Sequence, residues 1–278
     1  MLVLIAAPSA RLDAGSVGLA LARKWADTDA PVLFVDADTA GTRLAQRFGD
    51  IAFADFSPAD RGLPSLIAAR DSLTLRLLAD HCYSLDTAAG SLWALFAPSH
   101  PDGGVLAAQW LAERTGDLAA VDRERSIVLS SWLSHGAARL TPLVPSNAVL
   151  VVLAPVAALR DAHALGALLA EFGLTPPRCP HRALIVEGHT GLTDEVLAAE
   201  TGLHVAGRLQ VVDDETVLRL RGGRRERAFL RGIDDMAARL LSYSRQVAAA
   251  QQAVPAARPP QQPLVRAGIT ERSRGDAA

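Results

Sequence analysis

The chain has 278 residues, half of them hydrophobic, and a mean hydropathy of +0.18, so it is long enough to bury a substantial core. A formal net charge of −2 and a pI near 6.4 exclude a global attraction to nucleic acid or to an anionic membrane, and such binding would need a local basic patch. Cys82 and Cys179 have neither CxxC spacing nor clustered His or Cys partners, so the sequence indicates neither a disulfide framework nor a metal site. We expect ordinary core or surface thiols.

The N-terminal apolar run, residues 1–7, lacks the basic flank and the length of a signal peptide. No apolar stretch of the sequence reaches the roughly 18 residues of a membrane span. We therefore expect a cytoplasmic protein.

Apolar runs that read as strands alternate with amphipathic stretches that read as helices. The expected strands are residues 1–7, 31–38, 91–99, 126–132, 147–155, 182–188 and 204–210. The expected helices are residues 17–26, 42–49, 63–81, 103–121, 157–173, 193–202 and 226–249, with Gly173 as a C-terminal stop.

This alternation predicts an α/β fold with a mostly parallel, doubly wound sheet and helices on both faces. Such sheets bind ligands at the carboxyl ends of their strands. No linker interrupts the pattern, so we expect one domain over residues 1–249. Residues 250–278 are rich in Pro, Gln and Ala, which predicts a disordered tail.

Three stretches resemble the ParA/MinD group of deviant Walker-A P-loop NTPases, and most of all its actinobacterial MinD-like branch. They are "LALARKW" after the first strand, "VLFVDADTAGTRLAQRFG" (32–49) and "DEVLAAETGLHVAGRLQVVDDETVLRLRGG" (194–223). The element order matches over about residues 1–245, but only the first 50 residues and 194–223 are specific. The resemblance implies the P-loop NTPase fold, with a phosphate loop between the first strand and the first helix.

The phosphate loop of that family has the pattern K-G-G-x-G-K-[ST]-[ST], in which a lysine neutralises phosphate oxygens and a hydroxyl binds Mg²⁺. Aligned on "LALARKW", Ser9 takes the place of the leading lysine and Ala14 that of the phosphate lysine. Gly15 and Ser16 take the two hydroxyl positions, where only Ser16 matches in chemistry. The chain has a single lysine, Lys24, which lies inside the following helix. The resemblance therefore implies a degenerate loop.

Two charged residues stand where the family places glycines or their neighbours, Arg11 and Asp13. A carboxylate within a few ångströms of a triphosphate costs about 1–4 kcal/mol at effective dielectric constants of 80 to 20. Asp13 could instead cap the helix and so imitate a phosphate within the chain. Arg11 is the one nearby group that could compensate the lost lysine, and the alternative is an ordinary solvated arginine.

The second acidic element of the family is better preserved. Asp36 and Asp38 close the strand 31–38, where the resemblance implies roles near the attacking water, Mg²⁺ and the nucleotide-linked switch; capping of the next turn is the alternative. A later strand of the family ends in an aspartate, and here it ends in Ser130 and Ser131. His135 follows without a paired carboxylate, which is typical of an incidental histidine.

We interpret the chain as a pseudo-ATPase that serves as a protein-interaction scaffold in cell division, chromosome partitioning or envelope-assembly positioning, with no cofactor. It would bind a protein partner and form a homodimer through the apolar stretch "AGSVGL" (14–19). The alternative is an active ATPase that binds ATP and Mg²⁺ with Ser9, Arg11, Asp13, Gly15 and Ser16, ligates Mg²⁺ with Ser16 and Asp36, and uses Asp36 and Asp38 in catalysis. A small-molecule enzyme of the dethiobiotin-synthetase-like branch is a third reading, but it too needs the lysine.

Arginines gather between Arg219 and Arg231, where relatives bind DNA non-specifically. A solvated helix face in an arginine-biased protein is the alternative. The final helix has too little charge and too few aromatic residues for a membrane-surface helix, so we expect it to pack on the sheet.

Overall fold

The structure, a computed structural model, describes residues 1–8, 11–28, 31–38, 44–52, 61–86, 91–98, 100–122, 124–133, 148–220, 223–224 and 226–253. Its strands are β1 Leu2–Ala7, β2 Val32–Asp36, β3 Tyr83–Asp86, β4 Ser91–Leu95, β5 Ser126–Trp132, β6 Val149–Pro155, β7 Arg182–Glu187 and β8 His204–Leu209. Its helices are α1 Ala14–Ala26, α2 Leu44–Ala52, α3 Leu63–Ala69, α4 Leu75–His81, α5 Pro101–Val121, α6 Leu159–Glu171, α7 Asp194–Thr201, α8 Asp214–Arg219 and α9 Arg227–Ala253.

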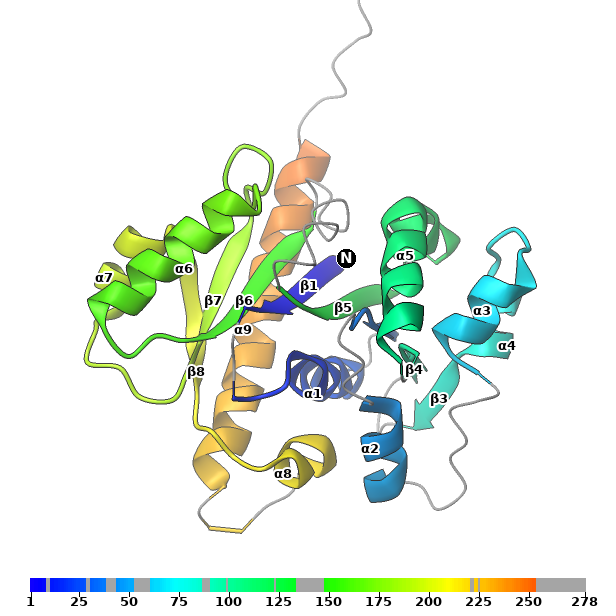
Figure 1. Ribbon diagram of the computed structural model, residues 1–278, viewed down its shortest axis with the longest axis horizontal. Helices are drawn as coiled ribbons and strands as arrows, with labels where there is room; N and C mark the ends of the chain where they lie inside the picture. The colour runs from blue at the N-terminus through cyan, green and yellow to red at the C-terminus, as the bar shows by residue number, and fades with distance from the viewer. Residues whose placement is uncertain are drawn as a thin grey trace, which may run out of the picture.

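The described strands form a sheet of eight strands in the order β3-β4-β2-β5-β1-β6-β7-β8 (Figure 1). Every neighbouring pair is parallel except β3 and β4. The central strands are continuous apolar runs because both faces of the sheet are covered, as parallel sheets require. The predicted α/β fold with a mostly parallel, doubly wound sheet is confirmed.

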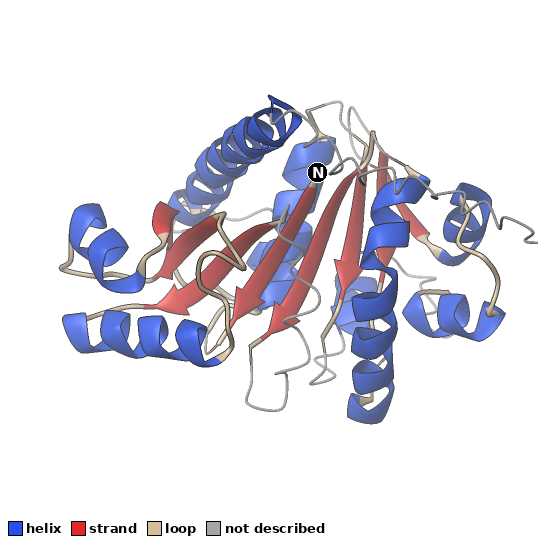
Figure 2. Ribbon diagram, turned by 90° about the horizontal axis from the view of Figure 1, so that it is seen from above, coloured by secondary structure: helices blue, strands red, loops and turns tan. Residues whose placement is uncertain are grey.

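Two layers of helices enclose the sheet, as the view in Figure 2 shows. The core on one face is built with α3, α4, α5, α6 and α7, and the core on the other face with α1, α2, α8 and α9. The predicted packing of the last helix is confirmed: Phe229, Ile233 and Met236 are buried, and the indole Nε1 of Trp25 donates to the carbonyl of Ala237 at 2.7 Å. No helix in the described part of the chain is long and apolar enough to cross a bilayer.

The single helix expected over residues 63–81 is wrong. Arg70 has a left-handed backbone, with φ of 55°, which ends α3, and the Thr74 hydroxyl then caps α4 by accepting the N–H of Leu77. The strand β3 follows at once and pairs with β4 in antiparallel orientation. Four residues carry too little periodicity to predict a strand, and the six residues of α8 were missed for the same reason.

Other local predictions are confirmed. Gly173 has φ of 65° directly after α6, as a C-terminal stop requires. Cys82 and Cys179 are free, buried thiols, and burial raises the pKa of Cys82 to about 12 and that of Cys179 to about 11. The last helix extends to Ala253, beyond the expected end at residue 249, and the rest of the predicted tail lies outside the described residues.

Candidate functional site

The candidate site lies at the carboxyl edge of the sheet, where β1 leads into α1. We call residues 8–13 the β1–α1 loop; within it, Ser9 and the residue after it are outside the described part of the chain. The ends of β2, β5 and β7 lie at the same edge, because all of these strands run parallel to β1. Parallel sheets place their ligand sites at this edge.

Glu187, the last residue of β7, binds the backbone of the β1–α1 loop. Its carboxylate accepts the N–H of Arg11 at Oε2 and the N–H of Leu12 at Oε1, each at 2.8 Å. The Glu187 side chain is buried. Its strand, β7, is not a neighbour of β1, because β6 lies between the two. Two N–H groups of the loop thus already bind a carboxylate of the chain itself.

Asp13 caps the N-terminus of α1. Its backbone is extended, with φ of −71° and ψ of 126°, and its Oδ2 accepts both the N–H and the hydroxyl of Ser16 at 2.8 Å. A carboxylate is stabilised there by the partial positive charge of the helix N-terminus. The prediction that Asp13 caps the helix is confirmed, and the hydroxyl of Ser16 is engaged by that cap.

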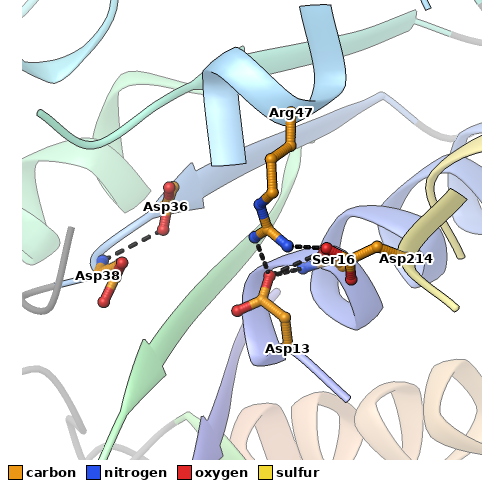
Figure 3. Close-up of polar contacts among 6 residues, drawn as sticks. All are labelled: Asp13, Ser16, Asp36, Asp38, Arg47 and Asp214. Carbon is orange, nitrogen blue, oxygen red and sulfur yellow. Dashed lines mark hydrogen bonds and ion pairs between the residues drawn. The ribbon is translucent and has the colours of Figure 1, made fainter. Parts of the chain in front are cut away.

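Arg47, from α2, is the cation of the site (Figure 3). Its Nη2 lies 2.8 Å from Asp13 Oδ2, and its Nη1 pairs with Asp214 in the first turn of α8. Burial lowers the pKa of the Arg47 guanidinium, but the charges and hydrogen bonds of Asp13 and Asp214 raise it above its ordinary value. Within the described residues, Asp13 Oδ1 and Arg47 Nε are buried without a hydrogen-bond partner.

Helix α2 packs directly on the first turn of α1. A side chain on Gly15 would place its Cβ 2.9 Å from Leu44 Cδ2 and 3.2 Å from Asp13 Oδ2, so any larger residue here would require the Leu44 side chain to shift. Leu44 and Phe48 of α2 are buried. Gly15 therefore allows close helix packing in this structure.

Asp36 and Asp38 lie at the end of β2, both buried. The N–H of Asp38 donates to Asp36 Oδ1 at 3.1 Å. Burial raises the pKa of Asp36 well above its usual range, and the nearby charges of Asp38 and Asp13 raise it further, while backbone hydrogen bonds from Asp38 and Ala97 oppose the shift. The environment of Asp36 thus favours a protonated carboxyl.

The two serines at the end of β5 differ in their contacts. Ser131 donates its hydroxyl to the carbonyl of Ala37 at 2.9 Å, which ties β5 to the end of β2. Ser130 pairs in register with Asp36 and is fully buried, and its hydroxyl has no hydrogen-bond partner in the described part of the chain. Gly18 of α1 packs on it, since an added Cβ would lie 3.1 Å from Ser130 Cβ.

The structure brings together most of the residues that the sequence indicated. Asp13 and Ser16 are in direct contact, and Asp36 lies close enough for its charge to interact with those of Asp38 and Asp13 (Figure 3). Arg11 is not part of this group: it is exposed and contributes its backbone N–H. The exposure of Arg11 agrees with the alternative of an ordinary solvated arginine, and Arg47 is a cation of this group that the sequence did not indicate. Ser9 and His135 lie outside the described residues.

The expected apolar contact surface at residues 14–19 is also wrong. These residues form the first turns of α1, and every one of them is buried within the domain. They face the sheet and α2, so they offer no exposed apolar patch. Lys24 lies further along α1 and pairs with Asp234 of α9 at 2.8 Å, which confirms it as a surface lysine of the helix.

Sequence reasoning missed Glu187, Arg47 and Asp214. Glu187 ends the predicted strand 182–188 in a carboxylate, which is the same signal that identified Asp36. Arg47 and Asp214 carry no such signal, since Arg47 looks like an ordinary surface residue of the expected helix 42–49 and Asp214 lies outside every expected helix.

No family model matches the chain, and no curated protein matches it. Several solved structures do match the chain. A cell division ATPase MinD from Pyrococcus furiosus aligns with a TM-score of 0.58 at 16% identity, over 87% of this chain and 99% of that one. MinD in the MinC:MinD cell division complex of Aquifex aeolicus aligns with a TM-score of 0.56 at 16% identity, over 87% of this chain and 96% of that one. A ParA family ATPase from Chlorobium tepidum aligns with a TM-score of 0.56 at 15% identity, over 86% of this chain and 98% of that one. The expected ParA/MinD-like fold is confirmed.

Proposed function

We propose that this chain, which has the fold of the MinD and ParA ATPases, is a pseudo-ATPase: a protein-interaction scaffold that works without nucleotide. One observation carries the proposal. The N–H groups of Arg11, Leu12 and Ser16, at the position of the expected phosphate loop, bind the carboxylates of Glu187 and Asp13. The anions that these N–H groups bind are therefore carboxylates of the protein itself.

The charge of the site supports the proposal. A triphosphate at the N-terminus of α1 would meet two carboxylates that already hold the N–H donors, and repulsion between like charges about 4 Å apart costs about 1–4 kcal/mol per pair. The only lysine of the chain pairs with Asp234 instead. Arg47 is a cation of this site among the described residues, but Asp13 and Asp214 both bind it.

The alternative, an active ATPase, also needs a Mg²⁺ site, and this requirement has no better support. Ser16 donates its hydroxyl to Asp13, so the hydroxyl that would ligate Mg²⁺ is already engaged within the protein. Among the described residues, no group of three or more His, Cys, Asp or Glu side chains is arranged to hold a metal. The site residues therefore fit ATP and Mg²⁺ poorly.

The process that we propose is positioning in cell division, partitioning or envelope assembly, with a protein partner. One solved structure of the same fold is the MinC:MinD cell division protein complex. A homodimer also remains part of the proposal, but residues 14–19 are buried and cannot form its interface. Exposed apolar side chains at the carboxyl edge, Val105 and Leu106 of α5 and Leu159 of α6, are available instead.

A basic surface near the start of α9 supports a second, weaker proposal of nucleic-acid binding. Arg224, Arg227 and Arg231 line a shallow hollow of about 470 Å³, together with Asp234. Arg219 pairs with Glu215 instead. Binding to a phosphate backbone would have to weaken steeply as the salt concentration rises, and a DNA affinity that does not depend on salt would contradict it.

Calorimetric titration with Mg-ATP tests the pseudo-ATPase proposal. We expect no heat of binding at micromolar concentrations and no turnover. Micromolar binding, or a turnover rate that the Asp36→Ala variant abolishes, would overturn the proposal in favour of the active ATPase that uses Arg11, Ser16, Asp36 and Asp38. An unchanged rate in Asp36→Ala would identify a contaminating ATPase.

A further inference from the structure

The surface at the start of α9 is hollowed and rich in arginine. The hollow has a volume of about 470 Å³, and both charged and apolar side chains line it. We call this surface the basic hollow; its described lining residues are Arg224, Arg227, Ala228, Leu230, Arg231 and Asp234.

Helix geometry directs the arginines of α9 outward. Phe229 and Ile233 are fully buried against the domain, so Arg227 and Arg231, one turn apart, lie together on the exposed face of the helix. The Nε of Arg231 also donates to the carbonyl of Arg227 at 3.4 Å, which keeps the two side chains close. Arg224 precedes the helix and is exposed. The three guanidinium groups therefore gather on one accessible surface.

The positive charge of the basic hollow is available for a partner. Within the described residues, none of its three arginines forms an ion pair with a carboxylate, whereas the neighbouring Arg219 pairs with Glu215 at 2.9 Å. The one carboxylate of the hollow, that of Asp234, lies 2.8 Å from Lys24 Nζ, and the lysine offsets its charge. The hollow thus has a net positive charge.

We propose that the basic hollow is the docking site for an acidic segment of a partner protein. The inference rests on the proposed function, because it names the chemistry of the protein partner that the scaffold binds. Guanidinium groups match carboxylates in shape and charge and can bind them through two parallel hydrogen bonds. Asp and Glu side chains of the partner would pair with Arg224, Arg227 and Arg231.

The composition of the hollow favours a peptide over a phosphate backbone. Ala228 and Leu230 line it beside the arginines and offer apolar contact to the side chains of a peptide. Asp234 is 55% exposed, so its carboxylate can accept an N–H of a peptide, whereas phosphate oxygens are acceptors only. The chain as a whole has a net charge of −2, which gives no long-range attraction to a nucleic acid.

Fluorescence anisotropy of the full chain with a labelled acidic peptide tests the proposal. The probe is a short fluorescein-labelled peptide in which Asp and Glu alternate with leucine, and its control is the same peptide with lysine in place of each acidic residue. We expect the acidic peptide to bind and the lysine peptide not to bind. The affinity should fall as the salt concentration rises, because exposed charges are screened.

A double variant identifies the binding surface. We expect Arg227→Gln combined with Arg231→Gln to weaken binding of the acidic peptide about tenfold, since two exposed ion pairs are lost. The matched control is Arg76→Gln combined with Arg160→Gln, which removes the same charge from exposed positions on α4 and α6. This control should keep the affinity within about twofold of wild type.

The proposal is overturned if the acidic peptide does not bind, or if the two double variants lose the same affinity. A fluorescein-labelled DNA duplex that binds more tightly than the peptide at the same salt concentration, and less tightly to the Arg227 and Arg231 double variant, would assign the hollow to nucleic acid instead. Should that variant not fold, Arg224→Gln, which lies outside α9, decides the question.

Binding of Mg-ATP to the wild-type chain would refute the pseudo-ATPase proposal. It would leave the difference between the two double variants unchanged, because that difference is measured without nucleotide. The two failures are therefore distinguishable.

Discussion

Two groups of acidic side chains lie at the same edge of the sheet, and their charges are satisfied in different ways. Glu187 and Asp13 receive three backbone N–H groups between them, together with the guanidinium of Arg47. Asp36 is buried beside Asp38, and its pKa is raised rather than lowered. The first group binds N–H donors and a guanidinium, whereas in the second group burial and like charge disfavour the ionised form of Asp36.

At the β1–α1 loop, side-chain carboxylates of the chain bind the N–H donors. At the end of β2, burial and like charge favour the protonated form of Asp36. The two groups therefore make opposite contributions to stability, and this can be measured.

The largest effect is expected from Glu187→Ala. The substitution leaves the N–H groups of Arg11 and Leu12 without their acceptor, and each unsatisfied buried donor costs about 1–3 kcal/mol. We expect the free energy of unfolding in urea to fall by about 2–4 kcal/mol. Glu187→Gln keeps an acceptor oxygen and should lose less.

The control for this experiment is Glu113→Ala on the exposed face of α5, which should stay within about 0.5 kcal/mol of wild type. Equal stabilities of Glu187→Ala and this control would mean that the carboxylate does not support the loop.

An effect of the opposite sign is expected from Asp36→Asn, a gain of about 0.5–2 kcal/mol at neutral pH. The folded chain holds the Asp36 proton more tightly than the unfolded chain, so wild-type stability falls as the pH rises from the usual value near 3.8 through the raised pKa. Asparagine cannot ionise, and its amide oxygen can still accept the N–H of Asp38.

Urea unfolding of wild type and Asp36→Asn over a pH series checks this prediction. The advantage of the variant should vanish below pH 3.8, grow through the raised pKa and stay constant above it. A gain that is the same at every pH would show that repacking, and not the charge of Asp36, is responsible.

The smallest effect is expected from Lys24→Ala. Lys24 and Asp234 form a partly exposed pair, and such pairs contribute about 0–1 kcal/mol. Thermal unfolding should therefore show little change, and the pH dependence that Asp36 causes should remain. Loss of that pH dependence in Lys24→Ala would mean that the only lysine acts on the acidic edge after all.

The sequence predicted the fold well because the parallel strands are long apolar runs that need no partner to be recognised. It also predicted Asp13 as a helix cap and Asp36 and Asp38 as strand-end carboxylates, since these roles follow from neighbouring residues. Glu187 could not be placed on the loop, because its contact with Arg11 depends on the order of the strands. The position of α2, and with it the role of Arg47, depends on tertiary packing.

The contact between Glu187 and the β1–α1 loop also has a consequence for how the chain folds. It joins residues 175 and 176 positions apart, among the most remote contacts that a domain of this size can make. Contacts of such high sequence separation form only after the entropy of closing a long loop has been overcome. The loop next to the first strand can thus reach its final conformation only after the seventh strand has joined the sheet, so one of the first segments to be synthesised is among the last to become ordered.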